Sequence, residues 1–329
     1  MPQITYEGRS YVTEGDETVL DCLLRHGESV SYGCRAGACQ SCLMQAVDGA
    51  PPSDSQKGLK DTQKFDRQFL ACLCHPTTDL EVAIPGAAAK TYTSPVIDVE
   101  RLNAEIARVR LGLPAGFKYR AGQFINIVAP GGVSRSYSLA SVPDEDDYLE
   151  LHVRRIPSGL VSGWIYDELK TNTELTISEA MGQCFYVPAR NDQPLLLIGT
   201  GSGLAPLYGI ARDALRQGHT GAIHLYHGSS NQDGIYYFEE MSALAEKHPH
   251  FNYTPTLSRP HELPKVASGR AHEIALQSLG ALRGWRIYLC GHPEMVHGTK
   301  KQAFLAGAAM QDIYADPFTF VQHPPKAVG

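Results

Sequence analysis

The chain has 329 residues, more than one hydrophobic core usually serves, so we expect two or three domains. Its composition is that of a globular protein, and a net charge of −6 argues against generic nucleic-acid binding. No apolar run approaches the length that spans a bilayer, and the N-terminus lacks a basic-then-apolar signal. Eight cysteines without such a signal favour metal or redox chemistry over a disulfide framework, so we predict a cytoplasmic protein outside the membrane.

The first elements are short. Residues 4–6 and 10–13 predict a β-hairpin, and residues 19–24 predict a helix that begins after Asp16 to Thr18 and ends at Gly27. Residues 1–84 hold 12 acidic against 7 basic side chains. Such an acidic surface either steers a basic partner or is simply solvated.

A cysteine-rich loop follows this helix. Cys34, Cys39 and Cys42 have the spacing C-x4-C-x2-C, and Cys72 comes after a gap of 29 residues, on a strand predicted over residues 69–73. This spacing is typical of a [2Fe–2S] cluster whose fourth thiolate comes from a distant segment. Zinc sites usually pair cysteines in two separate knuckles, so three on one loop favour iron and sulfur. Cys74 is the rival fourth ligand.

Past a predicted linker at residues 85–90, strands at 96–99, 106–111, 124–128 and 148–154 indicate a small antiparallel barrel. Within it, Arg135 can pair with phosphate oxygens, Tyr137 can stack on an aromatic ring, and Ser138 can bond to the polar edge of that ring. Residues 159–162 then begin a helix, and a helix N-terminus after a glycine suits a pyrophosphate.

The last part of the chain reads as a nucleotide-binding domain. An apolar strand at residues 195–198 runs into a glycine-rich loop at 199–206 and then into a helix, which is the arrangement of a phosphate cradle. The loop departs from G-x-G-x-x-G, and no carboxylate ends the next strand, so the ordinary dehydrogenase version is disfavoured. A second loop at residues 290–293 follows the strand at 286–289. These segments suit a doubly wound sheet.

The cysteine loop resembles that of plant-type ferredoxins. The R-x-Y-S strand, the G-x-x-S helix start, the G-T-G-x-G-x-A-P loop and the C-G-x-P loop resemble the ferredoxin–NADP⁺ reductase superfamily. Their order along the chain resembles the reductase components of bacterial oxygenases, such as those of benzoate dioxygenase, phenol hydroxylase and methane monooxygenase. The resemblance implies a multidomain α+β and α/β fold. Residues 1–86 would form a β-grasp ferredoxin domain, 91–190 a six-stranded antiparallel FAD-binding barrel, and 191–329 a doubly wound parallel α/β domain for NAD(P)H.

The resemblance also implies site residues. The cluster ligands would be Cys34, Cys39, Cys42 and Cys72, because the gap before Cys72 matches the ferredoxins. Residues placed in the flavin site are Arg135, Ser136, Tyr137, Ser138, His152, Val153, Gly159, Leu160, Val161, Ser162 and Phe318, with Phe320 as an alternative to Phe318. Residues placed in the nicotinamide site are Gly199, Thr200, Gly201, Gly203, Pro206, Ser229, Cys290, Gly291 and Pro293. Ser138 and Cys290 would lie beside the reacting rings as catalytic residues. The diphosphate of FAD fits best, although some relatives hold FMN.

The function implied is electron transfer from NADH through FAD to the cluster and on to a terminal oxygenase, of the Rieske or the di-iron hydroxylase type. Flavin is needed between them because nicotinamide gives two electrons at once and the cluster accepts one at a time. Two alternatives stay open: a reductase for a non-oxygenase acceptor in deoxysugar synthesis, and a redox-sensing module that turns nothing over. NADH is predicted over NADPH because residues 227–233 hold no Lys or Arg, with Arg259 as a cation that can reach across.

Overall fold

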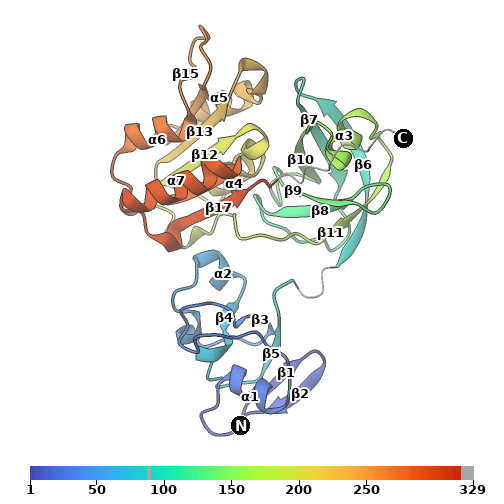
Figure 1. Cartoon of the computed structure of the whole chain (residues 1–329), viewed down its shortest axis with the longest axis vertical. Helices are drawn as coiled ribbons and strands as arrows, with labels where there is room; N and C mark the ends of the chain where they lie inside the picture. The colour runs from blue at the N-terminus through green and yellow to red at the C-terminus, as the bar shows by residue number, and fades with distance from the viewer. Residues whose placement is uncertain (87–89, 320–329) are drawn as a thin grey trace, which may run out of the picture. The chain divides into compact units, whose positions relative to one another are not determined.

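The computed structural model describes residues 1–86 and 90–319, and the chain divides into two compact units, residues 1–89 and 90–329. The first unit holds one sheet and the second holds two (Figure 1). The predicted linker falls at the division, although its residues 87–89 lie outside the described part. The three sheets confirm the predicted fold class, and the exact domain limits stay a prediction.

The first unit is a five-stranded mixed sheet in the order β2-β1-β5-β3-β4. Strands β1 and β5 are parallel, and the other neighbours are antiparallel. Helix α1 packs Leu20 and Leu23 into the same core as Ile4, Met44 and Phe69. The elements of this unit are β1 (Gln3–Tyr6), β2 (Arg9–Val12), α1 (Val19–Arg25), β3 (Leu43–Asp48), η1 (Ser53–Gln56), α2 (Asp61–Phe65), β4 (Gln68–Leu70), η2 (Ala71–Leu73) and β5 (Leu80–Ala83).

The strand predicted over residues 69–73 is shorter than expected. It ends at Leu70, and Cys72 lies in the 3₁₀ turn η2. The backbone N–H of Ala71 still donates to the carbonyl of Cys42, but the N–H of Cys74 donates to the carbonyl of Ala71 and closes the turn. The chain therefore leaves the sheet just where it returns to the cysteine loop.

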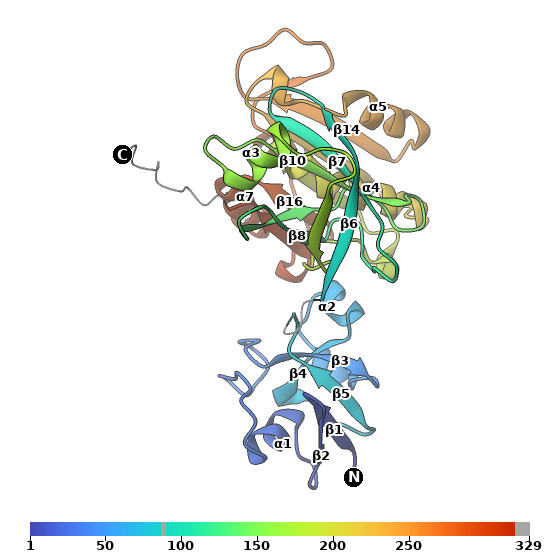
Figure 2. The ribbon, with the colours of Figure 1, turned by 90° about the vertical axis from the view of Figure 1, so that its right-hand side faces the viewer.

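The second unit begins with a barrel whose strand order is β10-β7-β6-β11-β8-β9, with every pairing antiparallel. A bridge between Leu139 and Leu151 joins the segments at its two edges. Figure 2 shows the long strand β6 beside β7, with β10 next to it. The elements are β6 (Thr91–Arg101), β7 (Ile106–Gly112), β8 (Phe124–Val128), β9 (Ser134–Ser138), β10 (Tyr148–Arg154), α3 (Leu160–Asp167) and β11 (Glu174–Ser178).

The last sheet is parallel throughout, in the order β15-β14-β13-β12-β16-β17. Consecutive residues of β12 point to opposite faces: Leu195 and Leu197 pack in the core that holds α4 and α5, and Leu196 and Ile198 pack in the core that holds α6 and α7. Four apolar residues in a row are therefore all buried. The elements are η3 (Pro188–Arg190), β12 (Leu195–Thr200), η4 (Gly201–Gly203), α4 (Leu204–Arg216), β13 (Ile223–Ser229), η5 (Gln232–Gly234), α5 (Phe238–Lys247), β14 (Phe251–Leu257), β15 (Ala267–Ser268), α6 (Ala271–Leu279), β16 (Arg286–Gly291), α7 (Pro293–Leu305), η6 (Met310–Asp312) and β17 (Ile313–Pro317).

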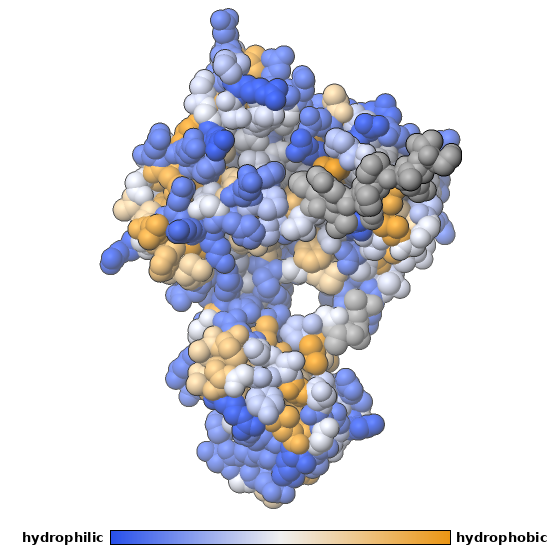
Figure 3. All heavy atoms as spheres, viewed as in Figure 1, coloured by the Kyte–Doolittle hydropathy of each residue, from blue (hydrophilic) through white to orange (hydrophobic). Residues whose placement is uncertain are grey.

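Much of the surface seen in Figure 3 is hydrophilic, with apolar residues in small groups. Among residues 1–86 and 90–319, no helix has the length and apolar character needed to cross a membrane.

The barrel and the parallel-sheet domain approach each other closely at a glycine. Gly122 has φ +94°, and a Cβ atom there would lie 2.4 Å from the Cys184 carbonyl oxygen and 2.7 Å from Ile210 Cδ1 on α4. Gly116, in the same barrel, has φ +73° but nothing within 4 Å of its Cβ position. At Gly122 both the positive φ and the lack of space disfavour a larger residue, whereas at Gly116 only the positive φ does.

Gly122→Ala is expected to lower the free energy of unfolding of the second unit by about 3 kcal/mol, because backbone strain and overpacking add. Gly116→Ala should cost only about 1 kcal/mol. Urea unfolding followed by tryptophan fluorescence measures both, since the two tryptophans, Trp164 and Trp285, lie in this unit. Equal losses for the two variants would contradict the close approach at Gly122.

Candidate functional site: a cysteine loop and two adjoining cavities

The cysteine loop between α1 and β3 turns its backbone amides toward its own sulfurs. The N–H of Cys34 donates to Cys39 Sγ at 3.4 Å, and the N–H groups of Cys39 and Ala36 donate to Cys34 Sγ at 3.3 and 3.4 Å. The N–H of Cys34, followed by the hydroxyl and the N–H of Ser41, lowers the pKa of Cys39 to about 6. Donors directed at thiolates are what a sulfur-ligated cluster requires.

Glycine at position 37 is demanded by packing. Gly37 has φ +76°, and a Cβ atom there would lie 2.5 Å from Leu73 Cδ1 in the turn that carries Cys72. Arg35 and Gln40 also have positive φ values, 53° and 56°. Such conformations are uncommon outside glycine and collect at functional sites. The loop therefore lies close to the turn that follows β4.

Cys72 and Cys74 differ in their surroundings. Burial and a hydrogen bond with the Cys42 thiol raise the pKa of Cys72 to about 11. Cys74 is fully buried in the core, where burial raises its pKa to about 12 and its side-chain partner is Ser55. The thiol beside the loop is thus that of Cys72.

Within the described residues, no three His, Cys, Asp or Glu side chains are grouped around a single metal position. A [2Fe–2S] cluster does not need such a group, because four thiolates are shared between two irons. Here Cys34 contacts Cys39, and Cys72 contacts Cys42. The donor set fits two irons with two thiolates each.

A cavity of about 540 Å³ lies in the second unit between the barrel and the parallel sheet. It lies beside strands β9 and β10, the start of α3, and the segment after β17. Its lining includes Asn126, Arg135, Ser136, Tyr137, Ser138, His152, Arg154, Gly159, Leu160, Val161, Ser162, Ser202, Asp316 and Phe318. An arginine, a helix N-terminus and a half-buried tyrosine together fit a flavin with its diphosphate. We call this the flavin cavity.

The helix start at Gly159 is shaped by contacts. A Cβ atom on Gly159 would lie 2.5 Å from Ser162 Oγ. That oxygen accepts a hydrogen bond of 3.2 Å from the N–H of Ile156, which draws the preceding chain against the first turn of α3. The first turn of α3, whose N–H groups have no partner within the helix, thus lines the cavity with Gly159 to Ser162.

Ser138 and Asp316 meet at the other end of the flavin cavity. Ser138 Oγ donates to Asp316 Oδ2 at 3.3 Å, across 178 residues of sequence. Burial raises the pKa of Asp316, and the hydrogen bond from Ser138 opposes this effect. Phe318 follows directly, and its N–H donates to the carbonyl of Gly291 at 2.8 Å.

A second cavity, of about 360 Å³, opens at the carboxyl ends of the parallel strands. Its lining includes Glu105, Arg154, Thr200, Gly201, Ser202, Ser229, Ser230, Ser258, Arg270, Gly291, His292 and Phe318. Arg154, Ser202 and Phe318 also line the flavin cavity, so the two cavities adjoin. Its position at the switch point of a doubly wound sheet is where such folds bind nucleotides. We call this the nucleotide cavity.

Two loops meet at the floor of the nucleotide cavity. A Cβ atom on Gly203 would lie 2.3 Å from the Cys290 carbonyl oxygen, and one on Gly291, with φ +119°, would lie 2.6 Å from Thr200 Oγ1. Thr200 Oγ1 accepts a 3.0 Å hydrogen bond from the N–H of His292. Both glycines are therefore required by the contact between the loops.

Several predicted site residues do not line either cavity: Val153, Gly199, Gly203, Pro206, Cys290 and Pro293. Cys290 is fully buried, with its sulfur 3.7 Å from that of Cys184, and burial raises its pKa well above the usual range. Pro206 lies buried within α4, and Pro293 begins α7. Phe320 lies outside the described residues.

Other residues at the cavities carry no predicted role. Arg154 lines both cavities and pairs with Glu105 at 2.9 Å. Asp316 opens the D-P-F sequence of residues 316–318, in which only Phe318 was given a role. Arg270, rather than Arg259, lines the nucleotide cavity. The D-P-F pattern was a usable signal for Asp316, but no local pattern marks Arg154 or Arg270.

Three protein families match the chain, in the predicted order. Residues 4–77 match the 2Fe-2S iron-sulfur cluster binding domain, residues 93–186 the oxidoreductase FAD-binding domain, and residues 197–301 the oxidoreductase NAD-binding domain. These matches confirm the predicted cofactors, a [2Fe–2S] cluster, FAD and a nicotinamide nucleotide.

Curated relatives match over nearly the whole chain. The reductase subunit of an aromatic O-demethylase from Amycolatopsis sp. is 33% identical and covers 96% of this chain and 98% of its own. The reductase component of phenol 2-monooxygenase from a Pseudomonas strain is 30% identical, over 94% and 92%. A CDP-6-deoxy-L-threo-D-glycero-4-hexulose-3-dehydrase reductase from Yersinia pestis is 27% identical, over 94% and 96%.

Among solved structures, a cytochrome P450 reductase of Amycolatopsis matches with a TM-score of 0.69 and 32% identity, over 97% of this chain and 99% of that one. The three domains, their order and these matches together identify the protein. It belongs to the family of NAD(P)H-dependent iron–sulfur flavoprotein reductases that includes the reductase components of multicomponent oxygenases.

Proposed function

We propose that this reductase takes electrons from NADH and delivers them, from its [2Fe–2S] cluster, to a terminal oxygenase of the Rieske or di-iron hydroxylase type. The observation that carries the proposal is the pair of adjoining cavities, which share Arg154, Ser202 and Phe318. When bound, FAD supplies the step from two-electron to one-electron chemistry. To reduce the flavin, a nicotinamide ring bound in the nucleotide cavity would need to reach only the wall that the two cavities share.

The proposed roles of the residues follow from their positions. Arg135 and the N-terminus of α3 would bind the flavin diphosphate, and Tyr137 and Phe318 would flank its ring. Ser138, held by Asp316, would bond to the polar edge of the ring. Thr200, Gly201 and Ser229 would contact the nucleotide. Cys290 would act through its backbone, since its thiol is buried beside Cys184.

Two acceptor classes have support. The phenol 2-monooxygenase relative favours an oxygenase, and the dehydrase reductase of Yersinia pestis favours an acceptor in deoxysugar chemistry. The higher identity of the former makes the oxygenase our proposal. A cytoplasmic location is supported by the eight cysteines, all of them free thiols. The two acceptor classes are distinguished by supplying NADH and the reductase to an isolated terminal oxygenase or to an isolated deoxysugar dehydrase and measuring which of the two is reduced.

The first prediction concerns the fourth cluster ligand. Cys72→Ser should lose most of the visible absorbance of the cluster, because only a ligand thiolate bonds to iron. Cys74→Ser should keep it, since that thiol is in the core beside Ser55. Iron analysis and absorbance per protein measure both. If Cys74→Ser lost the cluster absorbance and Cys72→Ser kept it, Cys74 and not Cys72 would be the fourth ligand.

The second prediction separates the electron path into halves. A chain without residues 1–84 should still oxidise NADH with ferricyanide, because both cavities lie in the second unit. It should reduce cytochrome c at less than about a tenth of the full-length rate, because it lacks the cluster. Fast cytochrome c reduction by the shortened chain would mean that electrons leave from the flavin.

The third prediction is that kcat/KM is higher for NADH than for NADPH. NADPH differs from NADH by a 2′-phosphate, which carries about two negative charges. Residues 227–233 hold no Lys or Arg, so this phosphate would lose its hydration with little charge-assisted pairing in return. Arg270 lines this cavity, as Arg154 does, and Arg270 Nη1 already lies 3.9 Å from Glu273 Oε1. Equal or better use of NADPH would refute the preference. Arg270→Ala, compared with Arg259→Ala, would then identify the responsible cation.

A further inference from the structure

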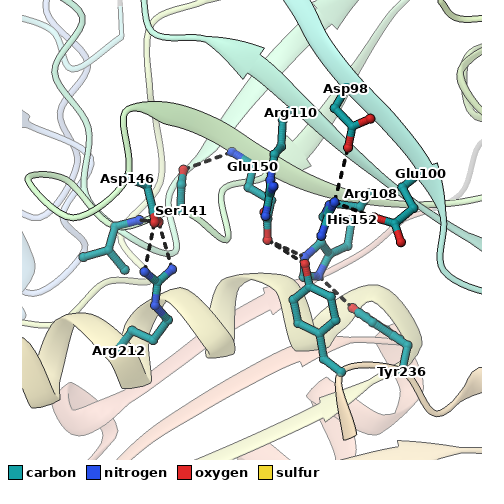
Figure 4. A network of polar contacts seen from close by, with 12 residues as sticks. Asp98, Glu100, Arg108, Arg110, Ser141, Asp146, Glu150, His152, Arg212 and Tyr236 are labelled. Atoms are coloured by element: carbon teal, nitrogen blue, oxygen red, sulfur yellow. Dashed lines mark hydrogen bonds and ion pairs between the residues drawn. The ribbon is translucent and has the colours of Figure 1, made fainter. Parts of the chain in front are cut away.

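A buried polar network joins the barrel to the parallel-sheet domain (Figure 4). Its centre is Glu150 on β10, which is 3% exposed. One carboxylate oxygen accepts from the Tyr237 hydroxyl at 2.9 Å and contacts His152 Nε2 at 3.1 Å. The other accepts from Arg110 Nε at 2.8 Å. A carboxylate so buried is stabilised only when every oxygen has a partner.

His152 carries this network onward. Its side chain is fully buried, and its second ring nitrogen, Nδ1, lies 3.0 Å from the Tyr236 hydroxyl. The Tyr236 ring packs edge-on against His227, whose Nε2 lies 3.1 Å from the carbonyl of Gly201 in the glycine loop. Burial lowers the pKa of His227 to about 4, so this imidazole stays neutral. Hydrogen bonds and one ring contact thus connect Glu150 to Gly201, which lines the nucleotide cavity.

The same imidazole belongs to the flavin cavity. His152 lines it, and so does Ser138 on the neighbouring segment. The bridge between Leu139 and Leu151 sets these two residues next to each other, because Leu139 follows Ser138 and Leu151 precedes His152. Alternate residues of β10 thus have three different roles. Glu150 is the centre of the network, His152 lines the flavin cavity, and Arg154 lines both cavities.

The tyrosines come from the segment that leads out of the nucleotide cavity. Ser229, Ser230 and Gly234 line that cavity, and Tyr236 and Tyr237 follow within three residues of Gly234. Tyr237 has φ +55°, a left-handed conformation that is unfavourable for a bulky residue. The hydrogen bond to Glu150 and the surrounding rings of His152 and Tyr208 hold it there.

We propose that Glu150 is a positioning residue for flavin reduction, which through His152, Tyr236 and Tyr237 holds the nucleotide-binding segment and the flavin cavity wall in one geometry. The inference rests on the proposed function, since it concerns how the two cavities face each other. Burial alone raises the pKa of Glu150, but His152, Arg110 and Tyr237 outweigh it and lower the pKa to about 2. The carboxylate is therefore charged throughout the working pH range, as a fixed anchor requires.

The structure offers two matched controls. Tyr253 has a buried hydroxyl that finds no hydrogen-bond partner among the described residues, so Tyr253→Phe removes a tyrosine hydroxyl that is bonded to no member of the network. Asp146 pairs with Arg212 of α4 at 2.8 Å, and neither residue lines a cavity. Asp146→Asn therefore weakens an ion pair between the barrel and the parallel-sheet domain in which Glu150 and His152 take no part.

The experiment compares Tyr236→Phe, Tyr237→Phe and Glu150→Gln with these controls in the FAD-loaded, full-length protein. One readout is the limiting rate of flavin reduction by NADH in stopped flow. The other is the change in flavin absorbance when NAD⁺ binds, which reports how the nicotinamide meets the flavin and needs no turnover. We expect the network variants to lose at least about tenfold in limiting rate, because small misplacements of reacting groups are costly. The NAD⁺-induced absorbance change should shrink, while the Kd of NAD⁺ changes less than about threefold, as expected for a positioning role.

The two tyrosine variants keep the test decisive if Glu150→Gln does not fold, since each removes a single hydroxyl. Unchanged rate and absorbance change in both would overturn the proposal. The same losses in Asp146→Asn or Tyr253→Phe would also overturn it, because domain docking in general would then explain them. A wild-type protein whose flavin NADH does not reduce would instead refute the proposed function.

Discussion

The site depends on a contact between two loops at the ends of neighbouring parallel strands. Gly203 lets the loop after β12 lie against the carbonyl of Cys290, and Gly291 lets the loop after β16 lie against Thr200. Helices α4 and α7 leave these loops toward opposite faces of the sheet, so the crevice between them stays open. Phe318 is bonded to Gly291, and its ring consequently reaches the wall shared by both cavities. Larger residues at the two glycines would displace each of these parts.

Much of this arrangement was predictable because its signals are local. The cysteine spacing, the R-x-Y-S strand and the four apolar residues of β12 each report on one segment. The shorter β4 was not predictable, because residues 69–73 continue the apolar pattern of a strand, whereas the N–H of Cys74 donates to the carbonyl of Ala71 and closes a turn there. For Cys290 and Pro206 the motif was informative about the backbone of the loop but not about where the side chain points. Both side chains are buried behind the loops that they mark.

The network around Glu150 shows why sequence patterns miss some polar residues. On β10, Glu150 and His152 read as the solvent face of a strand, since Leu149, Leu151 and Val153 fill the barrel core between them. Their partners Tyr236 and Tyr237 lie 84 and 87 residues away, in another domain. Packing of the parallel-sheet domain against the barrel thus buries an outer face of the barrel, and the alternation of apolar and polar residues along β10 does not indicate this burial.

Arg154 has a consequence for anyone who redesigns the coenzyme preference of this reductase. Its guanidinium borders both cavities and is tied to Glu105. A charge introduced into the nucleotide cavity beside Arg154, to recruit or repel a phosphate, would act on Arg154 as well, because physiological salt screens charges only weakly within about 8 Å. The flavin side would feel the same change through that one side chain. Coenzyme choice and flavin environment are therefore not separable design variables here, unless the substitution is made at residues that line the nucleotide cavity alone, such as Ser229 and Arg270.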